Sequence, residues 1–212
     1  MTLMCKLVAL FVPLWMITAE AATLQVVSDS VRVEGLIDKS DGQKLDDLLS
    51  SGLKNVIFGN SLGGTESGAR KYIAIIQKYG VSTEVQGKCF SACALAFAAG
   101  KERKFSKKNI DHILWFHMAR MAADESVEAP TNDDLLLMLD KLTDFKLREP
   151  ARSKIRKSFT AASGVMFISR PGFFGRRIQT LYCDGSQGAD ASLCTPLDDA
   201  DPLALGIVTS LD

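Results

Sequence analysis

Short apolar strands alternate with amphipathic helices over the first half of the chain, and this alternation constrains the fold more than any other feature. The apolar spacing predicts, in order, strand 31–37, helix 43–49, strand 55–58, helix 69–79, strand 81–85, helix 91–98 and strand 113–116. Strands that alternate with helices at this pitch are typical of an α/β fold with mainly parallel strands. The sequence contains no internal repeat and no low-complexity linker, so we expect one domain.

The pattern changes in the second half of the chain. Residues 132–147 predict a helix rich in Leu and Met, and residues 150–177 are mixed and basic. We therefore expect a helical region over 130–177 and an acidic C-terminal segment over 178–212. Five consecutive apolar residues at 135–139 cover more than one helical face. This helix predicts the interface of a homo-oligomer, unless the basic stretch after it folds back over the apolar excess.

Charge is balanced over the whole chain, with 25 basic and 25 acidic side chains and a net charge of zero. No global field therefore recruits nucleic acid or acidic lipid. Basic residues gather at 101–108 and 146–157, and no Lys or Arg follows Arg177. We interpret both the basic clusters and the acidic end as solvated surface.

Residues 1–21 have the features of a secretory signal peptide. Lys6 gives a positive start, residues 7–17 are apolar apart from Pro13, and Ala19–Ala21 supply a small-x-small cleavage pattern. We expect cleavage between Ala21 and Ala22 and a periplasmic or secreted protein. The apolar run is shorter than the about 20 residues of a transmembrane helix, and no other stretch is long enough to span a bilayer.

Four cysteines remain once Cys5 leaves with the signal peptide, and an even number suits an oxidising compartment. Cys183 and Cys194 bracket a loop of Gly, Ser, Asp and Ala that a disulfide would close. Cys89 and Cys93 are one helical turn apart, so they can form a second disulfide or remain two free thiols. The spacing does not fit a paired metal-binding motif and the chain has only two histidines, so we expect no metal site.

The segment Asn60–Gly64 lies between a predicted strand and a predicted helix. Its adjacent glycines, Gly63 and Gly64, let the backbone turn tightly and leave N–H groups unobstructed. Such N–H groups at a helix start stabilise developing negative charge. Taken alone, the segment fits an ordinary turn equally well.

Ser91 stands at the corner between a predicted strand and a helix of small residues. A hydroxyl at such a corner can be exposed, and the dipole of the following helix favours an attacking oxyanion. A serine at this position also fits a simple helix N-cap.

Two histidines flank the last strand of this half. His117 follows directly after the apolar strand 113–116. From this position alone, its role can be structural or catalytic. His112 precedes the strand beside Asp111, and we expect it to be exposed.

Together, these segments resemble the ClpP peptidase and crotonase superfamily. The resemblance spans about residues 31–117 and is carried by Glu34–Asp38, Asn60–Gly64, the Gly-x-x-x-Ser-Ala corner at Ser91 and Ala92, Ala99–Arg103, and the strand that carries His117. The Cys-x-Ser-Ala-Cys-Ala-Leu run is similar to that of exported ClpP-like proteins of Gram-negative bacteria. The resemblance implies an α/β fold of repeated ββα units in a spiral, over residues 22–212.

The resemblance also implies roles for individual residues. Ser91 becomes the nucleophile and His117 its general base, because a neutral serine hydroxyl needs an adjacent imidazole. The N–H groups of Gly64 and Ala92 become the oxyanion hole, and Gly63 lets the loop approach. Leu62 stands where these peptidases usually have proline, so the loop is expected to be less rigid.

The resemblance places the third member of the triad, an aspartate, at about residues 163–168, which contain no acid. Asp198, Asp199 and Asp201 are candidates to replace it, and a Ser–His pair working at reduced rate is the alternative.

The resulting hypothesis is an exported serine hydrolase, most simply a peptidase that acts without ATP. Its substrates would be peptides, unfolded segments or small acyl compounds, with no cofactor and no ATP-dependent unfoldase. The main alternative is a binding or assembly protein that keeps the fold without efficient catalysis. Acyl-CoA chemistry is disfavoured because CoA is not expected outside the cytoplasm.

Overall fold

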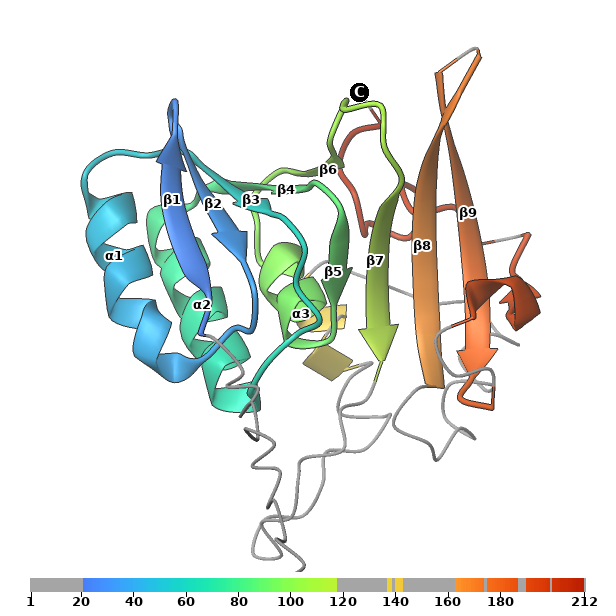
Figure 1. Cartoon of the computed structure of the whole chain (residues 1–212), viewed down its shortest axis with the longest axis horizontal. Helices are drawn as coiled ribbons and strands as arrows, with labels where there is room; N and C mark the ends of the chain where they lie inside the picture. Colours follow the sequence, from blue (N-terminus) through green and yellow to red (C-terminus); the bar gives the residue numbers. More distant parts are fainter. Residues whose placement is uncertain are drawn as a thin grey trace, which may run out of the picture.

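The protein, seen here as a computed structural model, is described for residues 21–117, 137–138, 140–142, 163–173, 175–186, 190–198 and 200–211. The described residues form two five-stranded sheets beside a layer of helices (Figure 1). The α/β class expected from the apolar spacing is present, with both parallel and antiparallel strand pairs.

The first sheet has the strand order β1-β2-β3-β4-β6. Its strands are β1 (Thr23–Val27), β2 (Ser30–Glu34), β3 (Asn55–Phe58), β4 (Ser82–Val85) and β6 (Arg103–Phe105). All neighbouring pairs are parallel except the β1–β2 hairpin. The predicted alternation of strands and helices in this part is confirmed.

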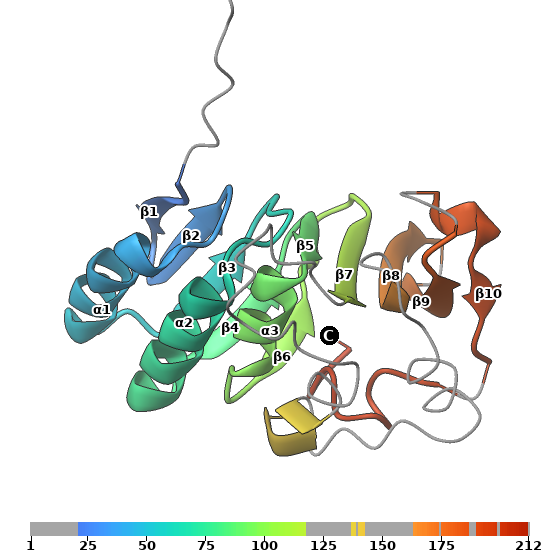
Figure 2. The same ribbon diagram turned by 90° about the horizontal axis from the view of Figure 1, so that it is seen from below.

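Three helices cover one face of the first sheet (Figure 2). They are α1 (Gly42–Ser50), which follows the short helix η1 (Lys39–Asp41), α2 (Glu66–Tyr79) and α3 (Ala92–Ala98). Helix α2 begins where Thr65 accepts a hydrogen bond from the Gly68 N–H and ends at Gly80 in the left-handed conformation. Inward residues such as Val33, Phe58 and Val85 pack against this helical layer and form the main core.

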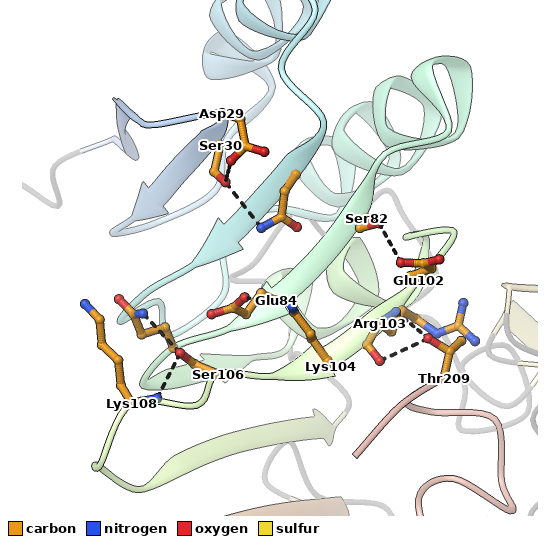
Figure 3. A network of polar contacts seen from close by, with 12 residues as sticks. Asp29, Ser30, Ser82, Glu84, Glu102, Arg103, Lys104, Ser106, Lys108 and Thr209 are labelled. Atoms are coloured by element: carbon orange, nitrogen blue, oxygen red, sulfur yellow. Dashed lines mark hydrogen bonds and ion pairs between the residues drawn. The ribbon is translucent and has the colours of Figure 1, made fainter. Parts of the chain in front are cut away.

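The opposite face of the first sheet is polar (Figure 3). On the helix side of the β6 edge, in the row of Thr83, the buried Arg103 donates to the carbonyl oxygens of Gly100, Gly206 and Ile207 at 2.7, 2.7 and 3.1 Å. Its N–H also donates to the Thr209 hydroxyl at 2.8 Å. Arg103 therefore fastens the C-terminal residues to β6.

The second sheet has the order β10-β9-β8-β7-β5. It consists of β5 (Lys88–Phe90), β7 (His112–His117), β8 (Ser163–Gly172), β9 (Gly175–Asp184) and β10 (Thr195–Pro196), with the short helix η2 (Ala191–Leu193) before β10. Strands β5 and β7 are parallel, and the other pairs are antiparallel.

The β8–β9 hairpin corrects the expectation of a helical region over 130–177, because residues 163–172 and 175–177 are strand. Residues 137–138 and 140–142 are helical, with Leu142 packed against the main core and Leu137 exposed. The rest of the expected assembly helix lies outside the described residues, so its role as an interface stays a prediction. Among the described residues, no helix is long and apolar enough to cross a membrane.

The signal-peptide expectation falls mainly on residues 1–20, which lie outside the described part of the chain. Ala21 forms a parallel bridge with Leu36, and the Ala22 N–H donates to the Asp41 carboxylate at 3.2 Å. The two residues of the expected cleavage point therefore lie against the first sheet and η1. Cleavage itself stays a prediction.

Candidate active site

Ser91 lies at a sharp turn between β5 and α3. Its backbone has φ 52° and ψ −119°, a combination that non-glycine residues rarely adopt. The turn is held by the Ser91 N–H, which donates to the Trp115 carbonyl of β7 at 2.9 Å. Such a conformation costs about 1–3 kcal/mol and persists only where the surrounding structure imposes it.

A disulfide spans this turn. Cys89 in β5 and Cys93 in α3 are bonded, with 5.2 Å between their Cα atoms. The second predicted disulfide, Cys183–Cys194, is also present and joins β9 to the end of η2. The pairing of both cysteine pairs is therefore confirmed, and the choice between a disulfide and free thiols at Cys89 and Cys93 is resolved in favour of the disulfide.

The glycine loop is fixed directly to the strand that precedes Ser91. The Ser61 N–H donates to the Lys88 carbonyl at 2.8 Å, and the Phe90 N–H donates to the Ser61 carbonyl at 3.1 Å. The Asn60 side chain accepts from the Lys88 N–H at 3.1 Å. The loop and β5 therefore behave as neighbouring strands over a short stretch.

Gly63 lies against Ser91. A Cβ atom at Gly63, whose φ is +114°, would be 2.8 Å from the Ser91 Cβ and 3.3 Å from its Oγ. At Gly64 a Cβ would be 1.9 Å from the Ile37 carbonyl oxygen. Only glycines allow this loop to pack between Ile37 and Ser91.

Two N–H groups remain available near the Ser91 hydroxyl. The Gly63 N–H is used, since it donates to the Ser61 hydroxyl at 3.2 Å. The Gly64 N–H has no acceptor among the described residues, and the Ala92 N–H belongs to the first turn of α3, where the helix supplies no acceptor. This pair matches the two donors that the sequence suggested for an oxyanion hole. The role of the pair in catalysis stays a prediction.

His117 ends β7, beside the strand that leads to Ser91. The register pairs Phe90 with Trp115, so Ser91 and His117 emerge at the same edge of two neighbouring parallel strands. Across the sheet His117 faces Gly164 of β8. A Cβ at Gly164 would be 1.9 Å from the Phe116 carbonyl oxygen and 2.9 Å from the His117 Cβ, so glycine is required to make room for this end of β7.

An aromatic cluster holds the His117 ring. The Trp115 ring lies 4.5 Å from the His117 ring, centroid to centroid, with an angle of 40° between the planes. Phe90 meets Trp115 edge-on at 5.4 Å. The Trp115 indole N–H is buried without a hydrogen-bond partner in the described structure. Sequence reasoning missed this cluster, although the two-residue spacing of Trp115 and His117 in a strand puts both on one face.

His112 is fully buried, which corrects the expectation that it is exposed. Its Nδ1 accepts the Gly87 N–H at 3.1 Å, and its Nε2 lies 2.9 Å from the Ser106 carbonyl oxygen, which only a protonated Nε2 can satisfy. Burial, and then the nearby Arg176 guanidinium, lower the pKa of the His112 imidazole. His112 is thus a neutral structural residue that links β5, β7 and the loop after β6.

The candidate third acids lie elsewhere. Asp201 accepts the Ala204 N–H at 2.8 Å, and the Ala200 carbonyl between Asp198 and Asp201 accepts from the Thr180 hydroxyl. Thr180 is in the same row of the second sheet as Leu114 of β7. Leu114 precedes His117 by three residues, so the two side chains are on opposite faces of β7. Asp199 lies outside the described residues.

The row of His117 itself contains Gly164 and Cys183 in the described strands, and so no carboxylate. The described residues also contain no group of three or more His, Cys, Asp or Glu side chains placed to hold a metal ion. The groups gathered at this edge of the sheet include a hydroxyl, an imidazole and two backbone N–H donors, and Asp184 ends β9 one row further on, opposite Ser163.

The sequence matches no known family model, and a search of curated proteins finds no match. Among solved structures, the chain is similar to a ClpP1 variant from Listeria monocytogenes, at 14% identity and a TM-score of 0.45, over 87% of this chain and 91% of that one. It is also similar to an enoyl-CoA hydratase from Bacillus anthracis, at 8% identity and a TM-score of 0.33, over 45% of this chain. The chain covers 50% of the hydratase's length. Likenesses of this size do not bear on the chemistry of this site.

Proposed function

We propose that this protein is an exported serine hydrolase in which Ser91 attacks an acyl carbon. The observation that carries the proposal is the strained Ser91 backbone at a strand-to-helix turn, with the Gly64 and Ala92 N–H groups beside it. A nucleophilic serine on a strained strand-to-helix turn also occurs in α/β-hydrolases, which supports this role for Ser91. An ordinary N-cap serine would instead bond its own helix, and the Ser91 side chain makes no such capping bond.

The proposed reaction proceeds in two steps. In the first, the Ser91 Oγ bonds to the carbonyl carbon while its proton passes to His117, and the carbonyl oxygen takes up negative charge facing the Gly64 and Ala92 N–H groups. Collapse of this intermediate expels the amine or alcohol, which takes the proton from His117. In the second step, water deprotonated by His117 attacks the acyl-enzyme and releases the acid and free Ser91.

The substrates that fit the proposal are extended peptides or small acyl compounds, handled without ATP and without an unfoldase. The proposed chemistry uses the Ser91 hydroxyl, the His117 imidazole and two backbone N–H groups, so it calls for no cofactor. Export to the periplasm or beyond is proposed from the N-terminal segment, and the two disulfides are compatible with an oxidising compartment.

Turnover assays with short p-nitrophenyl acyl esters and with an unfolded polypeptide, both without ATP, test the proposal. Ser91→Ala and His117→Ala are expected to lower the rate by at least about a thousandfold, as the loss of a catalytic nucleophile or base does. His112→Asn is the matched control and is expected to keep most of the activity. Equal losses from the two histidine variants, with both proteins folded, would refute the assignment of His117.

A binding or assembly protein with this fold is the second candidate. It is favoured by one observation: the Ala200 carbonyl, between the candidate acids Asp198 and Asp201, is bound to Thr180, whose sheet row meets β7 at Leu114 and not at His117. The two candidates separate in the same assay, because a binding protein would show no Ser91-dependent turnover on either substrate.

A further inference from the structure

The β8–β9 hairpin extends past the rest of its sheet. Strand β7 pairs with β8 only up to Ser169, so Arg170–Gly172 and Gly175–Arg177 pair with each other alone. Figure 1 shows this end of the hairpin rising above the neighbouring strands at the upper right. Phe173, at its turn, is 93% exposed.

Arg176 joins the hairpin to the loop between β6 and β7. Its guanidinium donates to the carbonyl oxygens of Lys108 and Ile110, both at 2.8 Å, and to the Ser169 hydroxyl at 2.7 Å. Because one planar group holds both segments, the loop and the hairpin form a single end of the molecule.

This end combines exposed apolar and basic side chains, and we call it the basic tip. Its exposed members are Lys107, Lys108, Ile110, Arg170, Phe173 and Arg177. Asp111, which lies 3.5 Å from Arg170, is the one acidic side chain in these segments. The whole chain has no net charge, so the basic tip is a strong local excess of positive charge.

We propose that the basic tip docks on an anionic lipid surface. Phe173 would enter the interface between headgroups and acyl chains, where an aromatic side chain is stabilised. The lysine and arginine side chains around it would contact lipid phosphates, each adding about fivefold to the affinity near a charged membrane. An exposed phenylalanine surrounded by basic side chains matches the acyl chains and anionic headgroups that a lipid surface offers together.

The basic tip and the candidate active site lie at opposite ends of β8. His117 pairs with Gly164, nine residues before Phe173 along β8, a separation of roughly 30 Å in an extended strand. A protein docked through the tip would therefore hold Ser91 away from the membrane. This inference does not depend on the proposed hydrolase activity.

Co-sedimentation with vesicles tests the inference. The purified protein is mixed with vesicles of phosphatidylcholine alone, or of phosphatidylcholine and phosphatidylglycerol in equal parts. We expect binding to the anionic vesicles that is weakened by salt. Phe173→Ser is expected to weaken it more than about tenfold. Lys107→Gln, Lys108→Gln and Arg177→Gln together are also expected to cost at least about tenfold.

The controls carry matched changes away from the tip. Leu193→Ala removes another exposed apolar side chain, and Lys39→Gln with Lys44→Gln removes two exposed lysines. Neither control is expected to change binding. The proposal is overturned by equal binding to neutral vesicles, by tip and control variants that behave alike, or by no binding at low salt. Light scattering gives a further contrary outcome. The proposal is overturned if the wild type is a homo-oligomer that does not bind vesicles and the tip variants are monomers, because the tip would then contact a second copy of the chain.

Discussion

The Trp115 indole lies 4.5 Å from the His117 imidazole, centroid to centroid, on the same face of β7. In serine hydrolases the third residue of the triad orients the histidine ring. Here an aromatic side chain in tilted contact restricts the same ring, and Gly164 on the neighbouring strand leaves the end of β7 the necessary space. We infer that Trp115 positions His117 for proton transfer.

Replacing Trp115 with Leu should lower kcat about fivefold and leave KM nearly unchanged, because an aromatic pair contributes about 1 kcal/mol to the ring's orientation. Trp115→Phe keeps an aromatic ring beside His117 and should retain most of the rate. NMR gives a readout that is independent of activity, since the chain has only two histidines. The His117 ring protons should move downfield in Trp115→Leu as the indole ring current is lost, and those of His112 should not. Unmoved His117 signals would contradict the contact between the two rings.

The two disulfides should differ in what they support. Cys89 and Cys93 are four residues apart and span Ser91, whereas Cys183 and Cys194 are eleven apart and lie at the sheet edge. Loop entropy predicts that losing the first pair costs about 2 kcal/mol of unfolding free energy and losing the second about 3 kcal/mol. The rate of ester hydrolysis should fall more when the Cys89–Cys93 pair is lost, because only that pair holds the strained turn at Ser91. Urea unfolding and ester hydrolysis of the two double-alanine variants measure both; a larger rate loss from Cys183→Ala with Cys194→Ala would be inconsistent with this account.

Gly63→Ala should slow the reaction by crowding the nucleophile. The added methyl group would lie 2.8 Å from the Ser91 Cβ. Gly52→Ala is the matched control, since Gly52 also has a positive φ, +99°, but a methyl group there would meet nothing within 4 Å. Both variants should lose stability from the positive φ, and Gly63→Ala should lose more because its methyl group also meets Ser91. Only Gly63→Ala should lose activity, and equal activity of the two would show that the loop does not approach the reacting atoms.

Acid should destabilise the fold through His112. Its pKa is lowered by burial and by Arg176, so the unfolded chain binds the proton more readily than the native protein. This contribution to stability is complete above the unfolded pKa of about 6.5 and is lost as pH falls below it. Between pH 7.5 and pH 5.5, the free energy of unfolding measured with urea should fall more for the wild type than for His112→Asn. This window lies above the usual range of carboxyl groups, so an identical pH dependence in the two proteins would argue against a neutral, buried His112.

Much of the first sheet could be predicted because its signals are local. Apolar runs, the Thr65 cap and the Gly80 stop define strands and helices within a few residues of sequence. The meeting of Ser91 and His117 also follows from strand ends, since the carboxyl ends of the parallel strands β5 and β7 lie at one edge of a sheet, whereas Gly63 reaches Ser91 through the bridge between Ser61 and Cys89.

The second sheet was harder to predict, because its partners are distant in sequence. The run Val165–Ile168 is apolar throughout, and such a run does not distinguish a buried strand from a helix. His112 looks exposed beside Asp111 until Ser106 and Gly87 close around both ring nitrogens. Trp115 becomes notable only when its pairing with Phe90 places it beside Ser91.

If Ser91 is an activated nucleophile, a fluorophosphonate probe will form a covalent adduct with its hydroxyl, and mass spectrometry will map that adduct. Ser91→Ala and Ser91→Gly both remove the hydroxyl, and Ser91→Gly should be the more stable of the two by about 1 kcal/mol because glycine tolerates φ 52°. We expect a single phosphonylated residue, Ser91, and no adduct in either variant. An intact, folded protein that stays unlabelled, or one labelled equally after Ser91→Ala, would contradict the assignment of Ser91 as the nucleophile.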